Sequence, residues 1–290
     1  MIQNPIRPSP LPKEFRQKVP SGSTYFKLTE TLRRENLHTV CEEAKCPNRT
    51  ECYAAGTLTF QILGELCTRR CGFCAEKTAR PNPVDESEPE RVLRAAKDLG
   101  LSHIVLTAPA RDDLRDGGAG VFARTVRLLK ENLRATVEVL VSDLEGNEAA
   151  LQTVLDSGPD VFNHNIETVR SLTPKVRSKA TYDRSLEVLE NASRRGASGM
   201  KTKSGLMVGL GETWDEIRQT FSDLSESGVK YVTVGQYLQP SEQHLSIQKF
   251  YTISEFAEVK KIASEFGFEK AFAGPLVRSS YHAGEMIQSV

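Results

Sequence analysis

The sequence has no apolar run near the roughly 18 residues needed to cross a bilayer. It begins Met-Ile-Gln-Asn-Pro, without an apolar signal region. Neither sign of charge is in excess, because 38 basic side chains balance 38 acidic ones, so no overall field would attract nucleic acid. We therefore expect a soluble cytoplasmic protein, or its organelle stroma or matrix equivalent, that binds neither membrane nor nucleic acid.

Cysteine is scarce, but all six cysteines fall into two triplets, with C-x4-C-x5-C spacing at Cys41, Cys46 and Cys52 and C-x3-C-x2-C spacing at Cys67, Cys71 and Cys74. A disulfide framework suits a short secreted chain, whereas this one has 290 residues. Zinc is the stronger alternative, but it usually takes four ligands in paired spacing. Neither triplet has a fourth cysteine nearby. The pattern favours iron–sulfur sites in a reducing compartment.

Three thiolates can hold three irons of a [4Fe-4S] cube and leave the fourth iron open to a small molecule. The spacing of Cys67, Cys71 and Cys74, with Phe73 just before the last cysteine, resembles the signature of the radical S-adenosylmethionine (SAM) superfamily. In that superfamily the open iron chelates SAM, and an electron from the cluster releases a 5′-deoxyadenosyl radical. The resemblance implies that these residues hold a catalytic [4Fe-4S] cluster and SAM.

Short apolar runs alternate with amphipathic stretches from Thr57 onward. The apolar runs, almost free of charge, predict strands buried on both faces at 57–66, 103–108, 136–142, 160–167, 202–210 and 231–238. The amphipathic stretches predict helices at 89–99, 119–132, 147–157, 182–195, 213–227 and 254–266. Several of these helices stop at a glycine, which takes the left-handed conformation without steric cost: Gly100, Gly158, Gly196, Gly228 and Gly267.

Six strand–helix repeats predict an α/β fold with a parallel sheet and right-handed crossovers. Six are fewer than the eight of a closed barrel, so we expect a partial, open (β/α)6 TIM-like barrel, which the resemblance also implies. A doubly wound flat sheet fits the pattern as well. The barrel core is predicted at 57–270, after an extension at 1–56 whose first 24 residues are an arm, and before a tail at 271–290. Cys67 follows the first predicted strand, at the end where ligands bind.

The two triplets, together with the stretch Arg278-Ser279-Ser280-Tyr281-His282-Ala283, resemble the lipoyl synthase family from about residue 38 to the end. Stretches 111–119, 163–169, 207–213 and 236–240 also match it, while Gly72 stands where the family usually has proline. The resemblance implies insertion of sulfur at C6 and C8 of a protein-bound octanoyl chain. It also implies a second [4Fe-4S] cluster at Cys41, Cys46 and Cys52, which is the sulfur source, with Ser280 rather than Ser279 as its labile fourth ligand.

Two groups of residues are candidates for contacts with SAM. The stretch Gly205-x-Met207-x-Gly209-x-x-Glu212 resembles the G-x-I-x-G-x-x-E element that lines the adenine pocket of radical SAM enzymes, and Gly209 and Gly211 let backbone approach a ligand closely. An ordinary strand-to-helix turn, with Thr213 capping the next helix, is the alternative. The second group places polar side chains in a strand made for burial, where they need partners: Asn163, Asn165 and Glu167. A ribose or amino acid headgroup would supply those partners, and so would hydrogen bonds inside the barrel.

Other polar residues receive no site role. His103, His164, His244 and His282 show no metal-like pairing. Arg69 and Arg70 are expected to be solvated, with tuning of the cluster potential or contact with a carboxylate as the alternative. The resemblance further implies three protein partners: an octanoylated lipoyl carrier protein or lipoyl domain, an electron donor such as flavodoxin or ferredoxin, and a cluster-supply protein. Another sulfur-inserting or methylthio-transferring radical SAM enzyme is one alternative. An electron-transfer or iron–sulfur carrier protein is the other, and it would call for fully ligated clusters.

Overall fold

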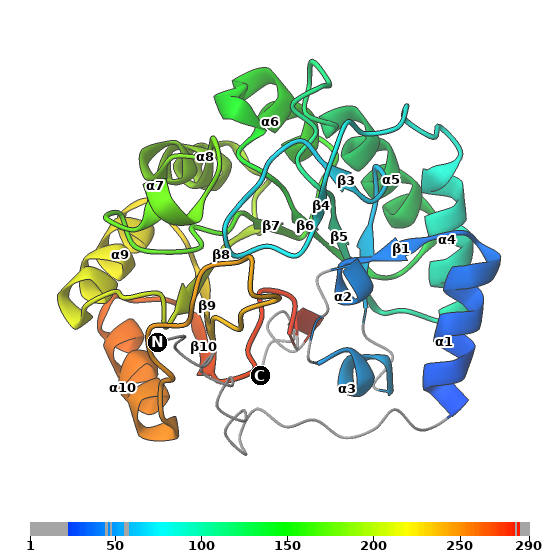
Figure 1. The fold of residues 1–290 in the computed structure, drawn as a ribbon. Coiled ribbons are helices and arrows are strands. Elements are labelled where there is room, and N and C mark those ends of the chain that lie inside the picture. The colour runs from blue at the N-terminus through cyan, green and yellow to red at the C-terminus, as the bar shows by residue number, and fades with distance from the viewer. Residues whose placement is uncertain (1–22, 44–45, 47, 55–57, 282, 285–290) are drawn as a thin grey trace.

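The computed structural model describes residues 23–43, 46, 48–54, 58–281 and 283–284. Its main sheet is an arc of parallel strands surrounded by helices (Figure 1). The strands follow one another in the order β1 (His38–Thr39), β2 (Thr59–Gln61), β5 (His103–Thr107), β6 (Thr136–Leu140), β7 (Val161–Asn163), β8 (Lys201–Val208), β9 (Tyr231–Gln236) and β10 (Lys270–Gly274). β1 pairs antiparallel with β2, and β10 is the other edge. The expected open barrel is confirmed.

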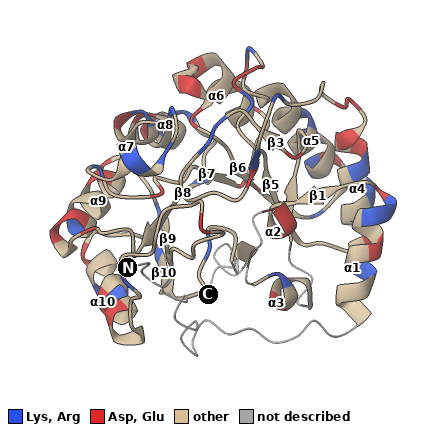
Figure 2. Ribbon diagram, in the orientation of Figure 1, with Lys and Arg blue, Asp and Glu red and all other residues tan. Residues whose placement is uncertain are grey.

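Helices alternate with the strands along the chain, and all but the four-residue helix bury several apolar side chains. They are α4 (Glu88–Leu99), α5 (Ala119–Asn132), α6 (Glu148–Leu155), α7 (Thr173–Val176), α8 (Tyr182–Arg195), α9 (Trp214–Glu226) and α10 (Ile253–Glu265). Both α5 and α8 have the predicted bounds. Charges of both signs are spread over these outer helices (Figure 2). Every residue of β9 is buried, as expected for a strand covered on both faces.

Three details of the predicted elements are wrong. The first predicted strand is too long, because β2 ends at Gln61 and the chain then turns through Leu63 and Gly64, which have φ of 67° and 86°. Cys67 therefore ends a separate short strand, β3 (Leu66–Cys67), which pairs with β4 (Lys77–Thr78). β7 is shorter than predicted, and the chain turns at Glu167. β10 is a seventh parallel strand that the pattern did not predict.

The glycines after the helices behave as expected at four positions. Gly100, Gly158, Gly228 and Gly267 all have φ between 64° and 78°. At Gly196 the expectation is wrong, since its φ is −66°. A Cβ atom there would lie 2.1 Å from the Met200 methyl, so close packing explains the glycine instead.

The N-terminal segments join the same core. α1 (Ser23–Arg34) buries Leu28 and Leu32 in a cluster that also contains Phe60 and Ile104 of the sheet. α2 (Val40–Glu43) and α3 (Arg49–Ala54) follow it. The predicted arm lies outside the described residues, except for the first two residues of α1. The boundary at 56/57 stays a prediction. No helix in the described ranges is long and apolar enough to span a bilayer.

Candidate functional site

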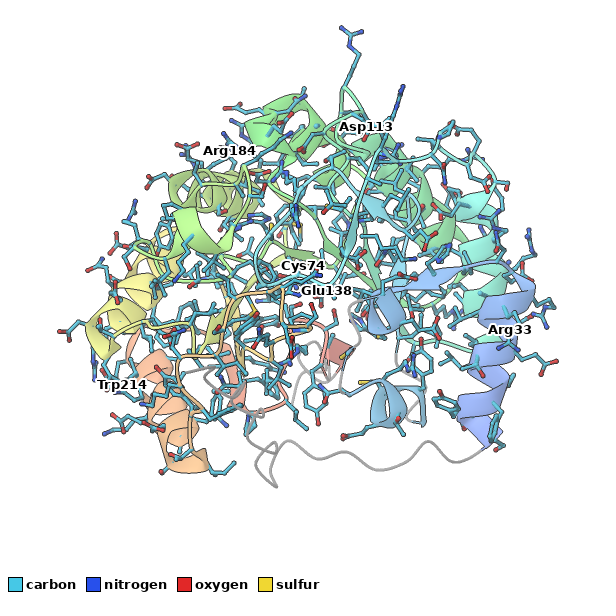
Figure 3. The ribbon with its side chains drawn as sticks, in the orientation of Figure 1. Arg33, Cys74, Asp113, Glu138, Arg184 and Trp214 are labelled. Atoms are coloured by element: carbon cyan, nitrogen blue, oxygen red, sulfur yellow. The ribbon has the colours of Figure 1, made fainter. Side chains whose placement is uncertain are left out.

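Cys67, the last residue of β3, lies together with Cys71 and Cys74 of the loop that follows this strand. The backbone of the neighbouring Thr68 donates to the carbonyl of Ala110, just past the carboxyl end of β5, so this loop sits at the ligand-binding end of the sheet. The three cysteines line a cavity of about 400 Å³ together with Arg69, Arg70, Glu76 and Thr78. Figure 3 shows Cys74 near the middle of the molecule, inside the arc of strands.

The environment of these thiols suits a metal cluster. The backbone N–H groups of Arg69 and Ser178 donate to the sulfurs of Cys67 and Cys71, each at 3.4 Å. Burial raises the pKa of the Cys71 and Cys74 thiols, and the neighbouring thiols of the triplet add to this effect. A cation that replaces the protons is therefore needed to hold Cys71 and Cys74 as thiolates. The free thiols, the cavity and the amide donors fit a [4Fe-4S] cluster.

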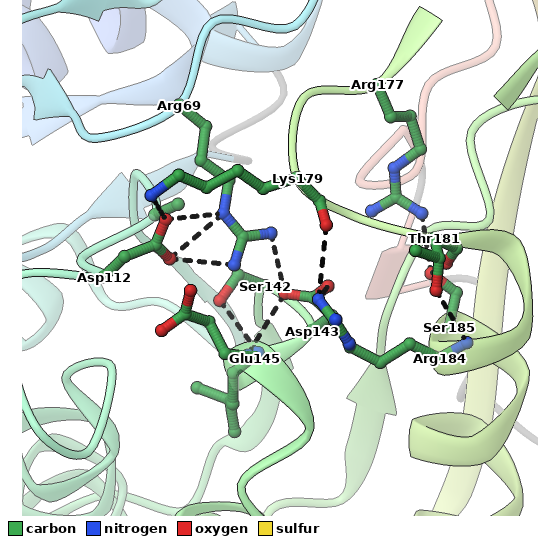
Figure 4. Close-up of polar contacts among 12 residues, drawn as sticks. Arg69, Asp112, Ser142, Asp143, Glu145, Arg177, Lys179, Thr181, Arg184 and Ser185 are labelled. Atoms are coloured by element: carbon green, nitrogen blue, oxygen red, sulfur yellow. Dashed lines mark hydrogen bonds and ion pairs between the residues drawn. The ribbon is translucent and has the colours of Figure 1, made fainter. Parts of the chain in front are cut away.

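Arg69 is not solvated, contrary to expectation. Its side chain is 4% exposed and forms ion pairs with Asp112 at 2.8 Å and Asp143 at 2.7 Å (Figure 4). Each carboxylate has a second cation, Lys179 on Asp112 and Arg184 on Asp143, both at 3.1 Å. This network ties the cysteine loop to the loops after β5 and β6. Arg70, its neighbour in sequence, is exposed as expected.

Gly72 donates its N–H to the carbonyl of Val176, at the end of α7, with a distance of 2.9 Å. Proline has no N–H and could not make this bond. A Cβ atom at Gly72 would also lie 2.9 Å from Cγ of Leu245. These two contacts favour glycine over the family's usual proline at position 72.

The first triplet lies on the short helices that precede the barrel. Cys41 belongs to α2, Cys52 belongs to α3, and Cys46 lies between them. Burial raises the pKa of both Cys41 and Cys52 to about 12, with the other thiols of the triplet contributing. The Cys46 N–H donates to the Cys41 carbonyl at 3.0 Å, and all three cysteines are free, so this donor set also fits a soft metal cluster.

The C-terminal tail packs against this first triplet. The Tyr281 hydroxyl lies 3.1 Å from Glu51, next to Cys52, and the Asn48 amide donates to the carbonyl of Leu276. Burial lowers the pKa of the Arg278 guanidinium, and the nearby Cys46 thiol partly offsets this effect. Ser279 and Ser280 are half-buried between these contacts, whereas His282 lies outside the described residues. The structure thus brings the tail and the triplet together, and Ser280 as a ligand stays a prediction.

Of the polar residues in the fourth predicted strand, Asn163 is paired inside the barrel. Its amide donates to Glu138 at 2.8 Å, and Glu138 also forms a fully buried ion pair with Lys203 at 3.1 Å. Figure 3 shows Glu138 in the middle of the molecule. Asn165 donates to Glu167 at 3.1 Å, yet the carbonyl oxygens of both asparagine side chains have no partner among the described residues. The alternative of hydrogen bonding within the barrel core accounts for part of this group.

Arg177 was not foreseen as part of the site. Its guanidinium bonds to Ser185 at 2.6 Å (Figure 4), and burial lowers its pKa. Glu167 and Cys71 are among the groups that partly offset this effect, so a buried cation lies near the cysteine loop. The sequence offers little signal for it, because Arg177 is one of 38 basic residues and lies in a loop.

The glycine-rich loop after β8 is built around its own glutamate. The Glu212 carboxylate accepts from the N–H groups of Gly209, Leu210 and Gly211 at 2.6 to 3.1 Å. Gly209 has φ of 99°, and a Cβ there would lie 2.5 Å from a backbone oxygen, so glycine is required. Thr213 caps α9 in a capping box, as the alternative interpretation expected. Contact of this loop with adenine stays a prediction.

His103, His164 and His244 form hydrogen bonds with side-chain hydroxyl groups or backbone carbonyl groups. His164 is buried between the Val141 carbonyl and the Ser185 hydroxyl, and burial lowers its pKa to about 4. His103 bonds to Thr136 at 2.8 Å. His244 instead lies 2.9 Å from the backbone oxygen of Cys74.

The family model of the radical SAM superfamily matches residues 62–224, more than half of the chain. Solved structures agree at the level of the fold. Methylornithine synthase superposes with a TM-score of 0.57 at 15% identity, over 73% of this chain and 70% of that chain. The FeFe-hydrogenase maturase HydG from Carboxydothermus hydrogenoformans gives 0.53 at 14% identity, over 78% of this chain and 64% of that chain. The chain is a radical SAM protein, and this class implies a [4Fe-4S] cluster and SAM.

Within this class, a model of the N-terminal domain of lipoyl synthase matches residues 4–46. Lipoyl synthase of Halalkalibacterium halodurans is 55% identical over 95% of this chain and 91% of the relative. Lipoyl synthase of Shouchella clausii is 53% identical over 95% of this chain and 90% of the relative. The chain belongs to the lipoyl synthase family. It is an enzyme, so the alternative of an electron-transfer carrier is wrong.

Proposed function

We propose that the protein inserts two sulfur atoms, at C6 and C8, into an octanoyl group carried by a lipoyl carrier protein or lipoyl domain. The observation that carries this proposal is the pairing of two free cysteine triplets with a tail that packs on the first of them. High identity to lipoyl synthases over nearly the whole chain supports the same activity. Neither acids, bases nor nucleophiles attack unactivated C–H bonds, so the chemistry must come from a cofactor.

Cys67, Cys71 and Cys74 would hold the cluster that binds SAM. When bound, this cluster and SAM together supply the radical that removes hydrogen from the substrate carbon. The backbone donors to Cys67 and Cys71 stabilise the charge on the thiolates. Phe73 packs with the apolar side chains beside the cavity. The contacts for SAM come from the chain around this cavity.

Arg177 would pair with the carboxylate of SAM, because it is a buried cation close to Cys71. Asn165 and Glu167 would receive the polar groups of the amino acid or ribose, since the Asn165 carbonyl oxygen has no partner among the described residues and burial raises the pKa of Glu167. The loop of Gly209, Gly211 and Glu212 would face the adenine, with Asn163 supporting the wall of the barrel.

Cys41, Cys46 and Cys52 would hold the second [4Fe-4S] cluster, the source of the inserted sulfur, and Ser280 would be its fourth ligand. A serine oxygen is a harder ligand than a thiolate and binds iron less tightly, so it can leave. The tail contacts at Tyr281 and Asn48 support this placement. The extension 1–56, the core 57–270 and the tail 271–290 would then share one site.

Besides the octanoylated carrier, two further partners complete the proposal: a flavodoxin or ferredoxin as electron donor, and a protein that supplies the second cluster. The location would be the cytoplasm or an equivalent matrix.

The test is iron counting after anaerobic reconstitution, combined with assays of SAM cleavage and lipoyl formation. The parent should carry about eight irons. Cys71→Ala should retain about half of them and cleave no SAM, while a parent that carries only four irons, unchanged by Cys41→Ala, would disprove the two-cluster site.

A further inference from the structure

The loop between β9 and α10, residues 238–250, lies on the loop that carries the second cysteine triplet. Two hydrogen bonds join these loops. The Leu245 N–H donates to the Gly72 carbonyl at 2.9 Å, and Nε2 of His244 lies 2.9 Å from the backbone oxygen of Cys74. Because the Gly72 N–H donates to Val176 on the other side, the cysteine loop is held between α7 and loop 238–250.

Loop 238–250 is itself fixed to the sheet. The hydroxyl of Tyr237, just after β9, donates to the Leu245 carbonyl at 2.7 Å, and the Gln239 amide donates to the His244 carbonyl at 3.0 Å. The Leu245 side chain fills the space where a Cβ of Gly72 would stand. The loop therefore presents His244 to the cysteine loop from a rigid support.

The partners of His244 define its tautomer. A backbone carbonyl can only accept, so Nε2 carries the hydrogen and donates to Cys74. Nδ1 lies 2.8 Å from the Ser241 hydroxyl, which then donates to it. These two bonds orient the ring. They also hold the backbone carbonyl of Cys74, the residue that carries the third thiol of the triplet.

We propose that His244 is a positioning residue for the SAM cluster: through the Cys74 carbonyl it fixes the third thiolate and with it the orientation of the open iron. This inference rests on the proposed cluster at Cys67, Cys71 and Cys74. Loss of the bond should loosen one of three ligands without removing any. We expect iron to leave about fivefold faster, the size of effect that one neutral hydrogen bond produces.

The test compares His244→Asn with His244→Gln in the reconstituted full-length protein. The side-chain amide of glutamine reaches the position of Nε2, whereas that of asparagine is one methylene too short. Gln243→Asn is the matched control, since it makes the same shortening at an exposed neighbour. Three quantities are measured: the rate of iron loss to a chelator, the change that SAM causes in the electron paramagnetic resonance spectrum of the reduced cluster, and the melting temperature.

We expect His244→Asn to lose iron faster and to alter the SAM-induced spectrum, with His244→Gln and Gln243→Asn close to the parent. Parent-like iron loss and spectra in His244→Asn would overturn the proposal. So would equal changes in both His244 variants, or a lower melting temperature with an unchanged spectrum, because either result would assign His244 to packing alone. A parent protein whose spectrum does not respond to SAM would instead disprove the proposed cluster site.

Discussion

The buried ion network around Arg69 gives the sharpest prediction for stability. Replacing Arg69 with methionine keeps most of the side-chain volume but removes the cation shared by Asp112 and Asp143, which are 7% and 0% exposed. Breaking a buried ion pair costs about 3–5 kcal/mol because the remaining charge stays desolvated. Lys179 and Arg184 still contact the two carboxylates, so we expect the lower end, about 3 kcal/mol.

Thermal unfolding of the anaerobically purified protein measures this loss. For a chain of this size, 1 kcal/mol lowers the melting temperature by about 2–4 °C, so Arg69→Met should melt roughly 6–12 °C below the parent. Arg70→Met is the matched control, because Arg70 is adjacent and exposed, and it should change stability by less than about 0.5 kcal/mol. The double variant Arg69→Met/Asp143→Asn should recover part of the loss. An Arg69→Met protein that melts with the Arg70→Met control would refute the network as a source of stability.

Two more predictions concern the tail and the barrel wall. Ser280→Cys should assemble a cluster with full iron content yet form lipoyl product more slowly, because a thiolate leaves iron less readily than an alkoxide. Lipoyl product formed at the parent rate would show that departure of this ligand is not needed. The folded pKa of His164, about 4, lies below the unfolded value of 6.5, so the unfolded chain binds the extra proton and stability falls as the pH drops from 6.5 toward 4. Between pH 7.5 and 5 the loss should reach about 2 kcal/mol. It is read as the difference in urea midpoint shift between the parent and His164→Gln, since other groups titrate in both proteins; equal shifts would contradict it.

The repeating pattern of strands and helices could be predicted because buried strands and amphipathic helices leave a periodic signal. α5 and α8 were located to the residue. The strand ends were less predictable, since they depend on backbone turns at Leu63 and Glu167, side chains that rarely adopt positive φ. β10 escaped prediction because its short sequence, Lys-Ala-Phe-Ala-Gly, lacks the β-branched residues that mark a buried strand.

The two cysteine triplets could be singled out as candidate ligand sets because their spacing is local. Residues that act on the site from far along the chain could not be predicted. Arg69 pairs with carboxylates 43 and 74 positions away, and His244 reaches a backbone oxygen 170 positions away. No local pattern records a contact of this kind, since any arginine or histidine in a loop has the same sequence appearance. Only the fold brings these groups together.

The central claim of this account is that the two triplets have different roles: the second holds the cluster that cleaves SAM, and the first holds the cluster that supplies sulfur. One measurement tests this claim directly. The full-length protein with Cys41, Cys46 and Cys52 all replaced by alanine is given SAM, a reductant and an octanoylated lipoyl domain, and 5′-deoxyadenosine and thiolated product are quantified together. We predict that this variant still forms 5′-deoxyadenosine, because Cys67, Cys71 and Cys74 are intact, and that it forms no C–S bond. Thiolated product from this variant would contradict the claim, since the inserted sulfur would then come from elsewhere.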